Sequence, residues 1–225
     1  MPEWRVHLHA ADKVSKIIGL KDEQVDLFKI GGLLPDAPWC TLCGVDEHET
    51  KYYLHRYHHG YKVALPIPDY DKYLEGVKDR IMDGWKDSSL IKGYIFHLCI
   101  DATYNASWND VVDVIDEHKY VIHTYSGNEL YKGSVDEFMA LKMKDIESYG
   151  ATLPFEDIHL KDIEWPYYSV VEALCGQRVT MIPDIIRLAN EEVNKEIGTR
   201  NIVFTDKQYA AMTDSGITIF KKLLG

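Results

Sequence analysis

Two features that would place the chain in or across a membrane are missing from its sequence. No apolar run approaches the roughly 20 residues needed to cross a bilayer. The first residues, Met1-Pro2-Glu3-Trp4-Arg5, do not begin the basic stretch and apolar core of a secretory signal peptide. We therefore expect a cytoplasmic protein without a transmembrane segment. The four cysteines are then expected to be reduced.

Basic residues are fewer than acidic residues in this sequence. Lys and Arg number 25 against 36 Asp and Glu, which gives a net charge of −11 with histidine neutral. An acidic surface repels the phosphate backbone, so we expect no stable nucleic-acid binding. A local metal site can still attract one phosphate group, because the charge of the ion dominates at short range. The acidic balance also argues against adsorption on anionic membranes. The oligomeric state stays open.

Several familiar motifs are also missing. No glycine-rich phosphate loop occurs, and no adjacent His-Asp pair of the HD phosphohydrolase type occurs. Cys40 and Cys43 form a single C-x-x-C without a βαβ pattern around it, which argues against a thioredoxin-like motif. With no second such motif, the two cysteines are either packed in a loop or part of a local zinc site with His48. Their role stays open.

The remaining pattern is mainly helical. At 225 residues, with 46% hydrophobic and 27% charged side chains, the chain suffices for one well-cored domain. Helical periodicity predicts helices over residues 6–19, 22–34, 69–85, 90–108, 135–149, 167–175, 181–197 and 206–222. Alternation over 119–132 predicts a small β-hairpin. We expect a mainly α fold in a single domain, residues 1–225, with a core over 1–150 and a C-terminal helical extension over 151–225 of open function.

The helix expected over 90–108 is the most apolar and should be the central buried helix. His97 and Asp101 lie four residues apart on it, and this spacing places both on one face. A carboxylate buried among apolar residues needs a partner. A metal ion held by both side chains is one solution. A His–Asp hydrogen bond within the core, or an Asp turned to solvent, is the alternative.

Other ligands can come from earlier in the chain, where six of the ten histidines precede residue 60. Asp36 follows a helix end at Pro35, and this turn gives its carboxylate a defined position. An ordinary Pro-Asp turn explains the same residues. His7 lies at the start of the first helix, where a partly exposed helix-end histidine is the alternative.

A third source is the histidine-rich patch of residues 55–59. In a helical turn His55 shares a face with His58 or His59, whereas in a strand it shares a face with His59. An exposed polar loop is the alternative. We take His55 and His58 as the leading ligands here. The full set of expected metal ligands is His7, Asp36, His55, His58, His97 and Asp101.

Mixed His and Asp ligation suits Zn²⁺ or another divalent first-row metal. An aspartate can also bridge two ions a few ångströms apart. We therefore expect one or two ions.

The order of these motifs resembles a known family. Met1-Pro2-x-Trp4-x-x-His7 comes first, then residues 32–36 and a His-rich loop, and last Gly93-Tyr94-x-x-His97-Leu98-x-x-Asp101-x-x-x-Asn105. Over residues 1–150 this order is similar to that of small zinc-dependent phospholipase C-like hydrolases. These are relatives of secreted phospholipase C and of the zinc-dependent single-strand nucleases.

The resemblance implies a mostly helical fold with a zinc cluster in a cleft, and phosphoester hydrolysis. It implies that Asp36, a loop histidine, His97 and Asp101 hold one ion. It also implies that Asp101 bridges to a second ion held by His7.

Two departures from the family pattern limit this comparison. The secreted enzymes use the free amino group of a processed N-terminus as a ligand, where this chain has Met1 and Pro2. They hold a further zinc through residues that include a histidine where this chain has Ser107, and a His-x-x-x-Glu motif that is absent here. We therefore expect one or two ions and not three.

The sequence thus predicts a metal-dependent phosphoester hydrolase such as a phosphodiesterase. The ion would lower the pKa of a water molecule, with Asp36 as the candidate catalytic residue that orients or deprotonates it. The substrate would be a small phosphorylated molecule or a phospholipid headgroup. The alternative is a non-catalytic, regulatory metal-binding protein with the same helical fold.

Overall fold

The structure is a computed structural model that describes residues 4–37, 85–116, 119–123, 127–164, 180–192 and 203–225. It also describes the four positions 167, 169, 171 and 172. Its described α-helices are α1 (Trp4–Ile17), α2 (Glu23–Leu33), α6 (Ser89–Asn109), α7 (Val135–Gly150), α9 (Ile182–Glu192) and α10 (Asp206–Leu224). Two short 3₁₀ helices accompany them, η1 (Leu34–Asp36) and η2 (Trp85–Asp87). The mainly helical fold expected from the sequence is confirmed.

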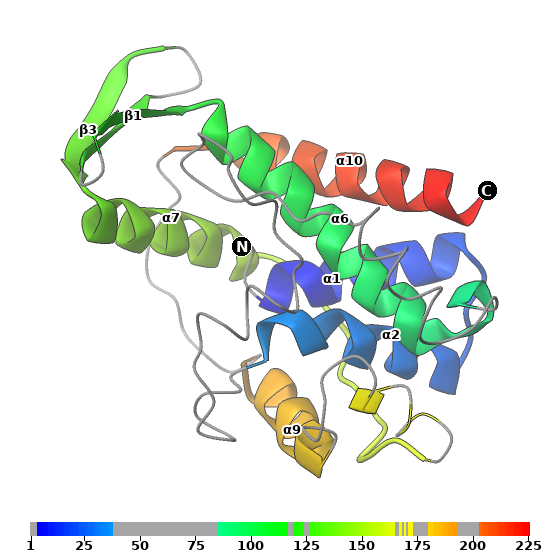
Figure 1. Ribbon diagram of the computed structural model, residues 1–225. Coiled ribbons are helices and arrows are strands. Elements are labelled where there is room, and N and C mark those ends of the chain that lie inside the picture. Colours follow the sequence, from blue (N-terminus) through cyan, green and yellow to red (C-terminus); the bar gives the residue numbers. More distant parts are fainter. Residues whose placement is uncertain are drawn as a thin grey trace.

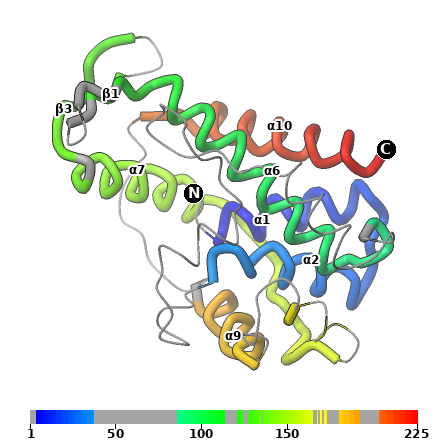
Figure 2. The backbone as a smooth tube through the Cα atoms, viewed as in Figure 1, coloured from blue at the N-terminus to red at the C-terminus, as the bar shows by residue number. Residues whose placement is uncertain are grey.

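Helix α6 is the centre of the described fold. Its first turn is capped by the Ser88 side chain, which accepts a hydrogen bond from the Ile91 N–H. Most of its side chains are buried, on every face of the helix, which confirms the expected central helix. Helix α2 packs on it from one side, and α10 lies along it on another (Figure 1). Figure 2 shows the same arrangement of the helices as a backbone tube.

Glycines bring the backbones of α2 and α6 into contact. A Cβ atom added at Gly31 would lie 1.9 Å from the carbonyl oxygen of Leu90. A Cβ atom added at Gly93 would lie 1.9 Å from the carbonyl oxygen of Phe28. No side chain fits at either position, so both contacts require glycine. The crossing is therefore closer than side-chain packing between two helices ordinarily allows.

The expected hairpin is confirmed, and it belongs to a three-stranded antiparallel sheet. Strands β2 (Lys119–His123) and β3 (Glu129–Ser134) pair as expected. Strand β1 (Val112–Asp116) adds to β2, with Val112 opposite Ile122. The sequence analysis missed β1, because five residues directly after a long helix carry too little alternation to identify a strand.

The segment after α7 is tied to the helical body by buried carboxylates. The Asp12 carboxylate accepts from the Glu156 N–H (2.7 Å). The Asp26 carboxylate accepts from the N–H groups of His159 and Leu160 (2.9 Å each). These bonds satisfy backbone donors that no regular element pairs. The segment can therefore run without secondary structure against α1 and α2.

Parts of the prediction lie outside the described residues. The helix expected over 69–85 is described only at Trp85, which begins η2. Most of the helix expected over 167–175 and the end of the one expected over 181–197 also fall outside. The division into a core and an extension stays a prediction. Within the described residues, the hydrophobic core includes side chains from both parts, such as Phe28 and Phe220.

Candidate metal centre

Four of the six predicted ligands converge in one buried cluster. His7 comes from α1, Asp36 from η1, and His97 and Asp101 from α6. One ligand atom from each lies within 4.8 Å of the others. His97 and Asp101 are fully buried, and the most exposed side chain of the four, that of Asp36, has a relative exposure of 8%. Three separate elements therefore bring four potential metal ligands to one point.

The glycine contacts place two of these ligands. Gly93 lies one turn before His97 on α6, and Gly32 lies one turn before Asp36 at the end of α2. The close crossing lets the Nδ1–H of His97 donate to the carbonyl oxygen of Gly32 (2.7 Å). A carbonyl oxygen only accepts, so Nδ1 carries the proton and the Nε2 lone pair faces the cluster. This backbone-oriented imidazole is the arrangement found in metal sites.

The distances within the cluster suit a bound ion better than direct hydrogen bonds. Nε2 of His7 lies 3.4 Å from Oδ1 of Asp101, and Nε2 of His97 lies 3.5 Å from Oδ2 of Asp101. Oδ2 of Asp36 lies 3.8 Å and 3.9 Å from the same two nitrogen atoms. A charge-assisted N–H···O bond is shorter, about 2.7–2.9 Å. Ligands of a tetrahedral zinc ion stand roughly 3.4 Å apart, given metal–ligand bonds of about 2.0–2.2 Å.

Asp101 presents one carboxylate oxygen to each imidazole. The rings of His7 and His97 stack, with centroids 3.9 Å apart and an interplanar angle of 9°. A carboxylate that faces the Nε2 atoms of two parallel imidazoles suits two ions a few ångströms apart. Four donors this close together also suit one ion. The geometry therefore leaves the choice between one and two ions open.

The electrostatics keep His7 in the form that binds metals. Burial, together with a smaller effect of the nearby His97, lowers the pKa of His7 to about 4. The carboxylates of Asp101 and Asp36 oppose this shift without cancelling it. The His7 imidazole is therefore neutral near pH 7, and neutral imidazole is the ligand form.

The polar row on α6 continues beyond the predicted ligands. Asn105 lies one turn after Asp101 and is buried. Its Oδ1 accepts from the ammonium of Lys142 on α7 (3.0 Å), whose side chain is also buried. The sequence analysis missed both residues as parts of the site. The i, i+4 spacing after Asp101 could have indicated Asn105, but nothing local indicates Lys142.

The other histidines and cysteines considered as ligands either lie away from the cluster or fall outside the described part of the chain. His55, His58, Cys40 and Cys43 lie outside it, so their predicted roles stay predictions. His9 points away from the cluster, and its Nδ1 bonds to the Pro154 carbonyl oxygen (2.7 Å).

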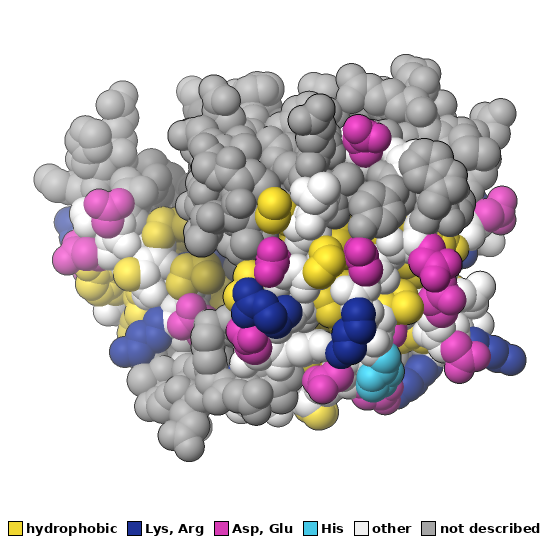
Figure 3. Space-filling model, turned by 90° about the horizontal axis from the view of Figure 1, so that it is seen from below, with side chains coloured by type: hydrophobic (Ala, Val, Ile, Leu, Met, Phe, Trp, Pro, Cys, Tyr) yellow, Lys and Arg dark blue, Asp and Glu magenta, His cyan; other side chains and the backbone are white. Residues whose placement is uncertain are grey.

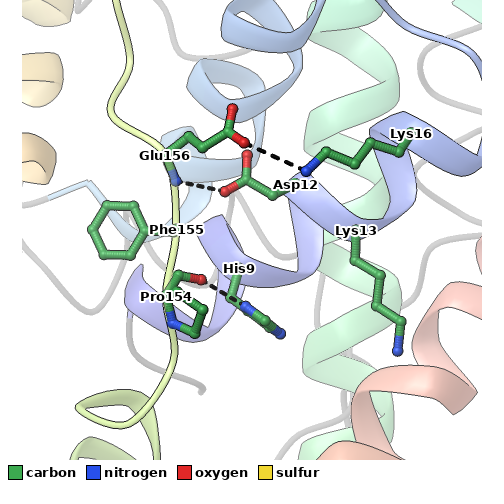
Figure 4. A pocket seen from close by; sticks show the side chains of 7 residues that line it. All are labelled: His9, Asp12, Lys13, Lys16, Pro154, Phe155 and Glu156. Carbon is green, nitrogen blue, oxygen red and sulfur yellow. Dashed lines mark hydrogen bonds and ion pairs between the residues drawn. The ribbon is translucent and has the colours of Figure 1, made fainter.

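His9 instead lines a hollow of about 410 Å³ between α1 and the segment after α7 (Figure 4). His9, Asp12, Lys13, Lys16, Pro154, Phe155 and Glu156 form its walls. Asp12 binds the Glu156 N–H, and Lys16 pairs with the Glu156 carboxylate (3.4 Å). The polar groups of the hollow therefore serve mainly to hold that segment.

On the face drawn in Figure 3, the described side chains form no basic patch. Lys and Arg side chains are interspersed there with Asp and Glu side chains. Among the described helices, none combines the length and apolar character that a membrane crossing requires. Comparison with family models, curated proteins and solved structures gives no match to this chain.

Proposed function

We propose that the protein binds a divalent metal, with zinc the first choice, and hydrolyses a phosphate ester at this centre. The observation that carries the proposal is the spacing of the four donors, which fits ligands around an ion. Two histidines and two aspartates form a donor set that zinc and other first-row metals accept.

Each residue has a distinct part in this proposal. His7, Asp36, His97 and Asp101 would hold the metal, and an ion bound there lowers the pKa of water and stabilises charge on phosphoryl oxygens. Gly32 orients His97 through its carbonyl oxygen. Asp36 retains the most contact with solvent of the four, so it is the group placed to orient or deprotonate a water molecule.

The choice of a phosphate ester as substrate rests on the order of the sequence motifs. That order resembles zinc-dependent phospholipase C-like hydrolases, which supports a phosphodiester or phosphomonoester of a small molecule or a lipid headgroup. The structure adds one supporting point: the cluster and the helices that carry it come from the part of the chain that holds the resemblance.

Burial favours a second candidate, a non-catalytic protein with a structural metal. His97 and Asp101 have no solvent exposure, and His7 has 3%. A structural zinc ion has a closed coordination sphere, whereas a catalytic one keeps an open position for water. X-ray absorption of the zinc-loaded protein separates the two, because only a catalytic site adds a water oxygen to the protein ligands.

The test of the proposed function is metal content together with hydrolysis of bis(p-nitrophenyl) phosphate. His7→Ala should lower both, whereas His9→Ala, two residues along the same helix and outside the cluster, should lower neither. Metal-free protein after zinc loading, or equal metal content in the two variants, would reject the metal centre. Metal binding without hydrolysis would favour the structural role.

A further inference from the structure

The buried lysine beside the metal centre has no described carboxylate to pair with. Lys142 has 1% exposure, and within the described part of the chain its ammonium makes one hydrogen bond, to Asn105, and no ion pair. An ammonium has three N–H donors, and the bond to Asn105 uses one of them. Burying a cation beside a neutral amide alone is costly.

Among the described residues, the carboxylates that act on Lys142 belong to the metal centre. Burial lowers the pKa of Lys142, and the negative charges of Asp101 and Asp36 raise it. Asn105, the hydrogen-bond partner of Lys142, stands one turn from Asp101 on the same face of α6. The ammonium therefore lies at the end of the row that runs from His97 through Asp101.

Charge balance then changes when a metal ion binds. The two carboxylates balance one divalent ion, and both imidazoles are neutral in the ligand form. Counting the described side chains around the centre, the Lys142 ammonium is then an excess positive charge in a buried region. A second ion would increase that excess. An anionic ligand restores the balance in either case.

We propose that Lys142 and the bound metal together form a subsite for a phosphate group, one anionic oxygen of which accepts from the Lys142 ammonium. This inference rests on the proposed metal centre and names the group that such a centre would hold. A phosphoryl oxygen can accept from an ammonium while another oxygen of the same group contacts a metal ion. Lysine binds phosphate in this way as a point charge.

The test uses cobalt as the metal probe and inorganic phosphate as the anion. Co²⁺ in a His and Asp site absorbs visible light, and the spectrum changes when a ligand joins the metal. Phosphate should change the spectrum of the cobalt-loaded protein to saturation. Lys142→Met, which keeps the volume and removes the charge, should require at least about tenfold more phosphate.

Lys144→Met is the matched control, because it removes the same charge from an exposed position on the same helix. It should leave the phosphate titration unchanged. Asn105→Asp is a second variant that keeps the lysine and gives its ammonium a carboxylate partner. It should also weaken phosphate binding, and it decides the question if Lys142→Met does not fold.

The outcomes separate the two proposals. If cobalt and zinc do not bind, the proposed metal centre fails. If cobalt binds but phosphate leaves the spectrum unchanged, or if Lys142→Met and Asn105→Asp bind phosphate as the unmodified protein does, the anion subsite is wrong and the metal centre stands.

Discussion

His97 on α6 donates through Nδ1 to the carbonyl oxygen of Gly32 on α2, across a helix crossing in which the backbones touch. This bond joins the packing of the core to the chemistry of the site. The crossing determines where the imidazole lies, and the acceptor determines which ring nitrogen keeps its lone pair. Changes in the helix contact should therefore reach the metal centre.

Gly31→Ala should destabilise the protein by about 1–3 kcal/mol, because its Cβ would overlap the Leu90 carbonyl oxygen. Chemical denaturation measures the change in the free energy of unfolding. Gly32→Ala is the matched control: its Cβ would lie 3.6 Å from the Gly93 carbonyl oxygen, which is an ordinary contact. An equal decrease in the free energy of unfolding for both variants would mean that the two helices lie farther apart than described.

His97→Ala and Asp101→Ala should each lower the bound metal. Each substitution removes one metal ligand from the cluster, so the ion is held by fewer protein atoms. Elemental analysis of the purified variants gives the stoichiometry. His123→Ala, which removes a histidine that pairs with Asp113 in the sheet, should keep the full metal content. Unchanged stoichiometry in both cluster variants would reject the assignment.

Chelation should lower the melting temperature of the metal-loaded protein. The ligands come from α1, η1 and α6, so an ion ties together three elements that separate on unfolding. At a free metal concentration of 100 times Kd, the stabilisation is about 2.7 kcal/mol. Differential scanning calorimetry with and without a chelator measures it. His7→Ala should show a smaller difference, and a difference as large as in the unmodified protein would contradict a role for His7.

Asp145→Ala should destabilise the fold and leave the metal content intact. The Asp145 carboxylate accepts from the Val203 N–H (2.9 Å), the Phe204 N–H (3.3 Å) and the Tyr209 hydroxyl (2.6 Å). Removing it leaves buried donors unsatisfied, at about 1–3 kcal/mol for each group. Tyr209→Phe should cost less, because it removes only one of the three bonds. Urea denaturation of both variants at saturating zinc gives the comparison.

Single alanine variants at His55, His58 and His59 should differ from one another. The predicted centre takes one further imidazole from this patch, so one variant should lose most of the metal and its neighbours little. Elemental analysis of the three proteins is the measurement. Three equal, small losses would show that the patch is a solvated surface, with the remaining coordination position open to water.

Local spacing was enough to predict part of this protein. The pairing of His97 with Asp101 follows from helical periodicity, because residues four apart share a face whatever surrounds the helix. The apolar length of α6 likewise predicted a central helix, and alternation around residues 126–128 predicted the pairing of β2 with β3. These features depend on neighbours in the chain.

Tertiary structure decided the rest. Strand β1 forms because β2 offers it a partner, and Lys142 reaches Asn105 because α7 packs beside α6. The meeting of His7 with Asp101 depends on contacts between segments about a hundred residues apart in the sequence. Periodicity states which face of a helix is buried but not which other segment covers it. That pairing depends on how all the faces pack together. Helical spacing could therefore pair His97 with Asp101, whereas only the family resemblance led us to expect His7 and Asp36 beside them, and tertiary packing is what brings the four side chains together.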